Sequence, residues 1–306
     1  MNSIHHVTLS NALPTEILYD IRDLLQMQEI KELSRVNKQL RQICLPSLFQ
    51  HVEFRFSKSG FEELSDFTES DVCHYTTSFT YVVPLLLKPE ILDFDYYTSH
   101  IFTFQTYRYV EEAKEIYDLK YHDGECPPYM VIYDRLRTMC EEQRSIIDSD
   151  LDLTVLSSAL QKLPKIRELK VDFCQPVEKK DWLEPYLDLD MTMPERSYGH
   201  HLQVVSNAIR VASYTGLALH TICLSQLQLP YHHSWQQQYS GSLLKVLGEL
   251  LEHIKHLRLD RCNFILELSQ FGPTLHRIGM KYLAEKHSSV SYGYGQVVSK
   301  FDSVQL

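Results

Sequence analysis

The stretch "IRELKVDFC", from Ile166 to Cys174, alternates apolar and polar side chains, as a short β-strand with one buried face does. Its apolar residues occupy positions 1, 4, 6 and 9. The same spacing recurs in "LHTICLSQL" from Leu219, "IKHLRLDRC" from Ile254 and "LHRIGMKYL" from Leu275. A recurring unit predicts a repeat architecture in which each unit buries its apolar face against its neighbours.

Most of these strands are preceded by a helical pattern. Apolar residues recur every three or four positions over 153–163, 204–212 and 243–251, and Pro164 ends the first stripe. Helix followed by strand, repeated, is the order of a solenoid, and the strand pattern resembles the L-x-x-L-x-L-x-x-N/C unit of leucine-rich repeats. The repeats are unevenly spaced, with the largest insertion at about 175–201. We therefore expect an irregular leucine-rich-repeat-like array over 151–290.

The alternation divides the strand residues into two faces. The side chains expected to point into the core are Leu169, Val171, Leu257 and Leu259. Their outward neighbours, which are candidates to face a substrate, are Glu168, Lys170, Asp172, Lys255, Arg258 and Asp260. Their mixed charge fits a polar partner surface, and it fits an ordinary solvated face equally well.

The N-terminal region has more large apolar side chains than short helices can bury among themselves. Pro14 pre-sets the first turn of a helix, and apolar residues then follow at helical spacing through 17–25 and 30–43. Pro46 is expected to end this helical part, and 48–56 alternates like a short strand. Either the body of the protein or a partner must cover the excess apolar face.

The same region, "LPTEILYDIRDLLQMQEIKELSRVNKQLRQICLPSLFQHVEF" from Leu13 to Phe54, resembles an F-box. The matching motifs, in order, are Leu13-Pro14-Thr15-Glu16-Ile17, Leu24, Leu33, Val36-Asn37-Lys38, Leu40-Arg41 and Pro46-Ser47-Leu48-Phe49. One departure is Leu40, where many members have Trp, which keeps an apolar contact with less aromatic area. The whole order of regions is similar to that of fungal-type F-box proteins.

The resemblance implies docking to the Skp-type adaptor of a cullin-RING ubiquitin ligase. The residues that it places at or near the adaptor are Leu13, Pro14, Ile17, Leu33 and Val36. It implies an α/β (α+β) fold, with a three-helix F-box over 9–56 and the array of alternating helices and short parallel strands over 151–290. Between them, 57–150 is expected to be a mixed helical and irregular connection, and 291–306 a tail.

Composition argues against several other partners. The chain of 306 residues has 30 Lys and Arg against 40 Asp and Glu, a net charge of −10, and no block of five basic residues. Nucleic-acid binding needs clustered basic side chains and is not expected. The apolar run at 81–87 is too short to span a bilayer, and the start of the chain lacks the pattern of a secretory signal. We expect a cytoplasmic or nuclear protein with no membrane partner.

Residues that commonly carry catalysis or bind metals form no recognised motif. Seven cysteines without a C-x-x-C pair indicate buried thiols rather than disulfides or a zinc site. The chain has no H-E-x-x-H motif, no phosphate-binding glycine loop and no G-x-S-x-G elbow. Asp148, Asp150 and Asp152 are interpreted as a helix N-terminus, where Asp caps the helix and suits its dipole. The sequence therefore predicts no catalytic residue, metal or cofactor.

Three functional hypotheses follow. The leading one is a non-catalytic subunit that recruits an unknown protein substrate to the ligase through the repeat array. The alternative is a leucine-rich-repeat-like interaction scaffold that acts outside the ligase. A hydrolase or transferase with an unrecognised site is the third, and a deep pocket with convergent His and acidic side chains would favour it.

Overall fold

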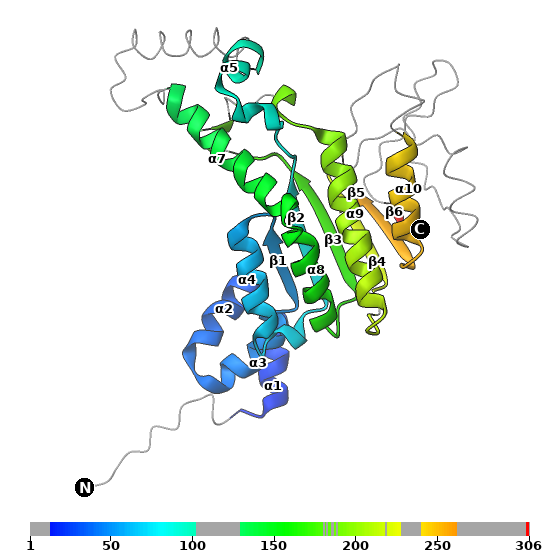
Figure 1. The fold of residues 1–306 in the computed structure, drawn as a ribbon. Coiled ribbons are helices and arrows are strands. Elements are labelled where there is room, and N and C mark those ends of the chain that lie inside the picture. Colours follow the sequence, from blue (N-terminus) through cyan, green and yellow to red (C-terminus); the bar gives the residue numbers. More distant parts are fainter. Residues whose placement is uncertain are drawn as a thin grey trace, which may run out of the picture.

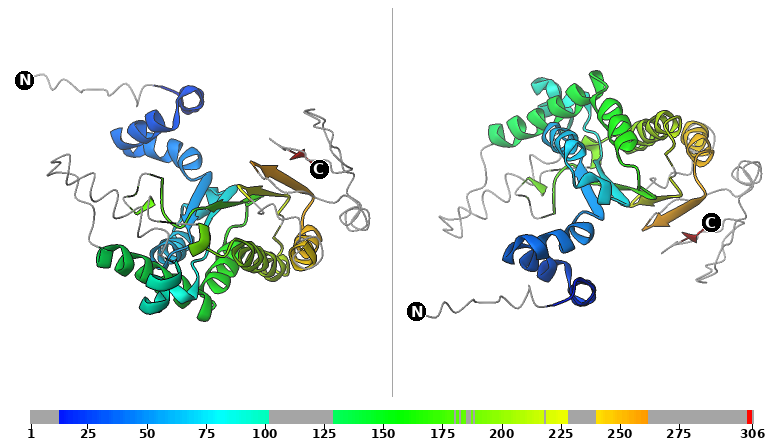
Figure 2. Two further views of the ribbon diagram at one scale, coloured as in Figure 1. Left: turned by 90° about the horizontal axis from the view of Figure 1, so that it is seen from above. Right: turned by 90° about the horizontal axis from the view of Figure 1, so that it is seen from below.

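A computed structural model describes residues 13–101, 129–179, 189–217, 219–227, 240–261 and 304–305, together with 181, 183, 184 and 187. It combines helices with a parallel sheet, as expected for an α/β fold (Figure 1). The first three helices are α1 (Thr15–Leu24), α2 (Met27–Val36) and α3 (Lys38–Leu48). They form a lobe that projects from the rest of the molecule beyond β1 (Figures 1 and 2).

Local signals set the limits of these helices. At the start of α2, Gln26 and Glu29 form a capping box, in which the Gln26 amide donates to Glu29 Oε2 at 2.7 Å. Asn37 caps α3, because its side-chain oxygen accepts from the Leu40 amide at 2.9 Å. The expectation that Pro46 ends the helix is wrong, since α3 continues to Leu48. A proline removes one amide donor, and the next hydrogen bond, from Phe49 N to Leu45 O, is still made.

Five parallel strands follow, in sequential order across one sheet: β1 (His51–Arg55), β2 (Ser78–Pro84), β3 (Glu168–Cys174), β4 (Thr221–Ser225) and β5 (His256–Asp260). The short strand β6 (Val304–Gln305) pairs antiparallel with β5. The register aligns one apolar row across the five parallel strands, made of Val52, Phe79, Leu169, Ile222 and Leu257. The fold therefore stacks equivalent positions of successive units.

Helices cover one face of this sheet (Figures 1 and 2). The long ones are α4 (Lys58–Glu69), α7 (Tyr129–Asp148), α8 (Leu151–Lys162), α9 (Pro194–Ser213) and α10 (Ser240–Leu251). Short turns between them are η2 (Cys73–Tyr75), η3 (Pro89–Leu92), α5 (Phe94–Tyr96), η4 (Tyr97–Ile101) and η6 (Leu189–Met191). Parallel neighbours joined by crossovers of one hand place every connecting helix on the same face.

The core lies between this helix layer and the sheet. Leu169 and Val171 are fully buried and Leu257 is 4% exposed, so their predicted inward orientation is confirmed. The side chain of Leu259 lies outside the described residues. A second, smaller core holds the N-terminal half of α7 against η3 and η4, around residues such as Ile91, Tyr97 and Leu136.

The parallel sheet extends beyond the range expected for the repeats. The helices of the predicted stripes are α8, α9 and α10, and the first three aligned stretches form β3, β4 and β5. However, β1 lies within the range 9–56 and β2 within 57–150, so strand pairing begins about one hundred residues before the expected array. The expected fourth unit at 275–283 lies outside the described residues, and the expected tail contributes β6.

Candidate functional site: an exposed apolar patch on the N-terminal helices

The N-terminal lobe has a core of its own that is very small. Leu18, Leu40 and Ile43 form its buried cluster, and the partly exposed Leu33 packs against them. Ile30 and Cys44 are the other buried apolar residues of the three helices. Large apolar side chains contribute about 1.5–3 kcal/mol each when buried. This is little for three helices, so the remaining apolar side chains of the lobe need another explanation.

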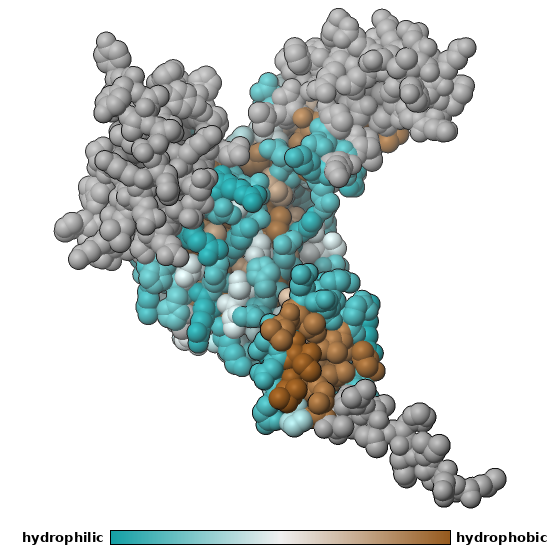
Figure 3. Space-filling model, turned by 180° about the vertical axis from the view of Figure 1, so that it is seen from behind, coloured by the Kyte–Doolittle hydropathy of each residue, from teal (hydrophilic) through white to brown (hydrophobic). Residues whose placement is uncertain are grey.

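Most of those remaining side chains face outward. Four of them form one stripe along α1, the α1 stripe, which consists of Leu13, just before the helix, and of Ile17, Ile21 and Leu24. Their spacing of three or four residues places them on one side of the helix, and Leu24 is 86% exposed. Met27 and Val36 on α2 are exposed as well, Val36 by 67%. We call these six residues the apolar patch, and Figure 3 shows apolar surface gathered on the lobe with a hydrophilic rim.

The structure divides the residues that sequence analysis places at the adaptor interface. Leu13, Pro14, Ile17 and Val36 are exposed, as an interface requires. Leu33 is partly buried and packs against the lobe's own core. Sequence reasoning missed Ile21, Leu24 and Met27 as exposed residues. The helical spacing of Ile21 and Leu24 was visible in the sequence, but periodicity alone does not say what covers an apolar face.

The lobe is joined to the sheet through the end of α3. Phe49 stacks on Phe67 of α4 with ring centroids 6.2 Å apart. Thr76 Oγ1 donates to the carbonyl of Phe49 at 3.0 Å, and the amide of Thr77 donates to the carbonyl of Gln50 at 2.9 Å. These contacts couple the direction of α3 to β1 and β2, so the lobe is held in a defined position beside the sheet.

The predicted substrate-facing residues lie on the face of the sheet opposite the helices, with one exception. Glu168, Lys170, Asp172, Arg258 and Asp260 share that face by strand alternation and register. Lys255 is exposed but lies one residue before β5, out of step with this alternation.

Neighbouring side chains bind several of these residues. Arg258 Nη2 donates to Glu168 Oε1 at 2.9 Å, across β4, and Lys170 Nζ lies 3.1 Å from Asp172 Oδ2. Gln226 Nε2 also donates to Asp172, at 3.1 Å. The face is therefore a polar surface of side chains paired across strands and within one strand, which suits solvent contact and a polar partner alike.

A buried polar cluster lies between the sheet and the helix layer. Asp152, which sequence analysis interprets as part of a capping segment, is 1% exposed and accepts a hydrogen bond from His200 Nε2 at 2.7 Å. Asp150 precedes α8 without a side-chain capping bond. The predicted helix N-terminus is confirmed, since α8 begins at Leu151 with Asp150 at its N-cap position and Asp152 in its first turn. Asp152, rather than Asp150, accepts a backbone hydrogen bond there, from the amide of Leu153 at 2.8 Å, and it also joins α8 to α9. Asp152 and His200 are 48 residues apart in the sequence, so no local pattern around Asp152 indicates this contact.

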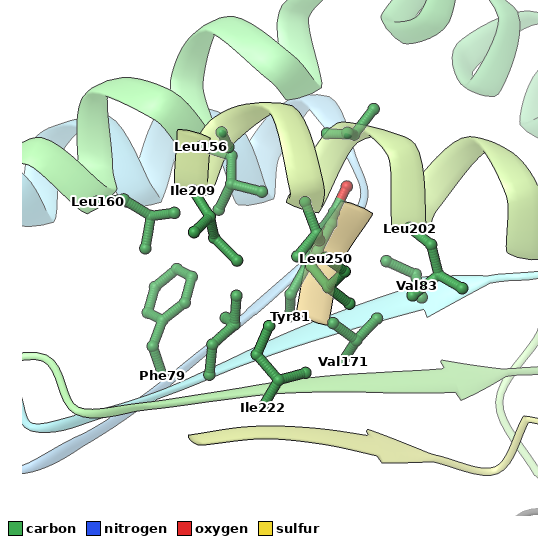
Figure 4. Packing of buried hydrophobic residues seen from close by; sticks show 14 of the residues in the cluster. Phe79, Tyr81, Val83, Leu156, Leu160, Val171, Leu202, Ile209, Ile222 and Leu250 are labelled. Atoms are coloured by element: carbon green, nitrogen blue, oxygen red, sulfur yellow. The ribbon is translucent and has the colours of Figure 1, made fainter. Parts of the chain in front are cut away.

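Next to this pair, His201 is fully buried and its Nε2 donates to the carbonyl of Pro84 at 3.2 Å. Burial above all, and then the neighbouring His200, lower the pKa of His201 to about 3. Tyr81 rises from β2 with its hydroxyl toward the helices (Figure 4), and burial followed by the charge of Asp152 raises its pKa. These shifts keep both side chains neutral inside the core.

The chemistry of these groups favours structural roles. Ser197, three residues before His200, is fully buried, donates to the carbonyl of Met193 and accepts from the amide of Leu86. Burial raises the pKa of Cys140 and of Cys174 to about 11, so both thiols stay protonated near neutral pH. Within the described residues, no three His, Cys, Asp or Glu side chains are placed to bind a metal ion.

The described helices include none with the length and apolar character needed to cross a bilayer. Comparisons with protein-family models, with curated proteins and with solved structures found no match. The apolar patch is therefore interpreted from its own geometry and from the sequence motifs that form it.

Proposed function

We propose that this protein is a non-catalytic substrate-recognition subunit of a Skp–cullin–F-box type ubiquitin ligase. The N-terminal lobe binds the Skp-type adaptor, and the sheet with its helices holds the target protein. The protein supplies proximity: it raises the effective concentration of substrate lysines near the conjugating enzyme. It acts in the cytoplasm or the nucleus, where that ligase works.

The observation that carries the proposal is the apolar patch. Six large apolar side chains are exposed on or just before two short helices, in a lobe that buries five apolar residues, namely Leu18, Ile30, Leu40, Ile43 and Cys44. Clustered apolar side chains with a polar rim mark protein interaction sites. The residues of the patch also belong to the segment that resembles an F-box, so exposure and resemblance point to the same helices.

The rest of the chain supports a binding role for the body. Its open sheet face has charges of both signs held in place by ion pairs, one across β4 and one within β3. A polar face of ordered side chains can recognise a protein with complementary charge. Glu168, Lys170, Asp172, Arg258 and Asp260 remain the candidates to contact the substrate.

The test is binding to the host's purified Skp-type adaptor by the full chain. The variant is Ile17→Asp with Leu24→Asp, because both side chains are exposed and neither belongs to the lobe's core. We expect it to weaken adaptor binding about 100-fold or more, since two central apolar contacts are each worth roughly 2 kcal/mol. Leu33→Asp is unsuitable because Leu33 packs against the lobe's core, so its replacement also affects folding.

The matched control is Tyr214→Asp, which removes a side chain that is 85% exposed at the end of α9. It should bind the adaptor like the wild type, and all variants should keep the wild-type urea midpoint. A folded wild type that does not bind, or an Ile17→Asp/Leu24→Asp variant that binds normally, would refute the proposal. An adaptor complex that fails to recruit the cullin would favour a scaffold that acts outside the ligase.

A further inference from the structure

The α1 stripe runs beside a row of acidic side chains. Glu16, Asp20 and Asp23 recur every three or four residues and are all exposed. A rotation of about 100° per residue places this row along the edge of the stripe. Asp23 pairs with Arg22, whose Nε lies 2.8 Å from Asp23 Oδ1. Within the described residues, Glu16 and Asp20 form no ion pair, so their charge faces outward.

The opposite charge gathers on α3. The charged residues of this helix are Lys38 and Arg41, both exposed, and Lys38 follows the exposed Val36 of the apolar patch by two residues. The intervening helix α2 has two acidic and two basic residues. The patch therefore has a negative edge along α1 and a positive edge at the start of α3.

Helix stability accounts for only part of this arrangement. Negative charge is favoured in the first turn of a helix and positive charge in the last. Glu16 lies in the first turn of α1 and agrees with the dipole, but Asp23 lies in the last turn of α1 and Lys38 is the first residue of α3. The charges of Asp23 and Lys38 thus oppose the dipole of their own helix. Local features that conflict with local stability are typical of functional sites.

We infer that the partner of the patch presents a charge-divided rim around an apolar groove, with basic side chains opposite α1 and acidic side chains opposite the start of α3. This inference rests on the proposed function and specifies the surface of the adaptor that the lobe recognises. Complementary rim charges accelerate association and fix the orientation of the two proteins, whereas the apolar patch sets how long the complex lasts.

The experiment measures the association rate constant of the full chain with the purified Skp-type adaptor at 50 mM and at 1 M NaCl. Asp20→Lys and Lys38→Glu reverse one charge on each edge. Lys38→Glu places an acidic residue where the dipole of α3 favours it, so weaker association does not come from loss of the helix. The matched controls are Asp66→Lys on α4 and Lys165→Glu after α8, which are exposed and make the same changes in net charge.

At 50 mM NaCl we expect each edge variant to associate about 3- to 10-fold more slowly than the wild type, as reversal of a rim charge does. The controls should stay within about twofold, and the difference should disappear at 1 M NaCl, where the Debye length is about 3 Å. Edge variants that match their controls, or that associate faster, would overturn the inference while adaptor binding itself still stands. If Ile17→Asp/Leu24→Asp and the edge variants all bind the adaptor like the wild type, the inference and the proposed function are both overturned.

Discussion

His201 tests the packing between the helix layer and the sheet. Its ring lies on α9, fully buried, with its centroid 4.9 Å from that of Phe56. Nε2 donates to the Pro84 carbonyl, and Nδ1 has no hydrogen-bond partner in the described part of the chain. A second proton on this ring would therefore be buried without an acceptor, which is why the folded protein keeps His201 neutral.

The size of the effect follows from the two pKa values. In the folded protein the pKa of His201 is about 3, against an ordinary value of 6.5. Between these values the unfolded chain holds one proton more than the folded chain, so stability falls as the pH falls through this window. The loss is at most about 1.4 kcal/mol per pH unit, and from pH 7.0 to 4.5 it amounts to about 2.5 kcal/mol.

The assay is urea unfolding of the wild type and of His201→Gln, followed by circular dichroism at several pH values from 7.0 to 4.5. Gln does not titrate, and its amide can replace the hydrogen bond to Pro84. Other groups contribute to both proteins, so the difference in unfolding free energy isolates His201. We expect this difference to shift by about 2.5 kcal/mol in favour of the variant as the pH falls. Two parallel pH profiles would show that His201 is not a buried neutral side chain.

Three further substitutions test the packing around the sheet. At Gly60, which follows β1, a Cβ would lie 2.2 Å from the carbonyl oxygen of Arg55, so Gly60→Ala should destabilise by about 1–3 kcal/mol in thermal unfolding. Gly199→Ala in α9 is the matched case, since nothing lies within 4 Å of the Cβ that the substitution adds. It should raise the free energy of unfolding by about 0.5–1 kcal/mol. If Gly60→Ala were more stable than Gly199→Ala, the close approach of Gly60 to the Arg55 carbonyl would be contradicted. Leu257→Asp buries an unpaired charge at a position that is 4% exposed, and should lower the unfolding free energy by about 3 kcal/mol or more in urea. A wild-type midpoint would exclude Leu257 from the core.

The strands could be predicted where their buried positions are aliphatic. The spacing of Leu169 and Val171 in β3 recurs in β4 and β5, so one pattern predicts three strands. In β2 the aligned positions are Phe79 and Tyr81, and the outward positions include Val82, which hides the alternation. A strand buried among aromatic neighbours therefore escapes a search for leucine-like spacing.

The polar contacts inside the core could not be predicted, because they join distant segments. Asp152 and His200 are 48 residues apart, and His201 and Pro84 are 117 residues apart. Local rules for Asp before or within a helix describe capping, which involves residues two or three positions away. The burial of Asp152 depends on how α9 packs beside α8, and this packing is a property of the whole sheet.

The difference between Leu33 and Leu24 shows what the resemblance to a family leaves open. Both occur in the matching motifs, and either fits an apolar contact with the adaptor. Leu33 is partly buried against the lobe's small core, whereas Leu24 is 86% exposed. A side chain that is partly buried is already partly desolvated, so it adds less when a partner binds, whereas an exposed one contributes the full transfer of its surface from water. The proposed binding energy therefore belongs mainly to the α1 stripe, and Leu33 mainly attaches α2 to the buried cluster of α1 and α3.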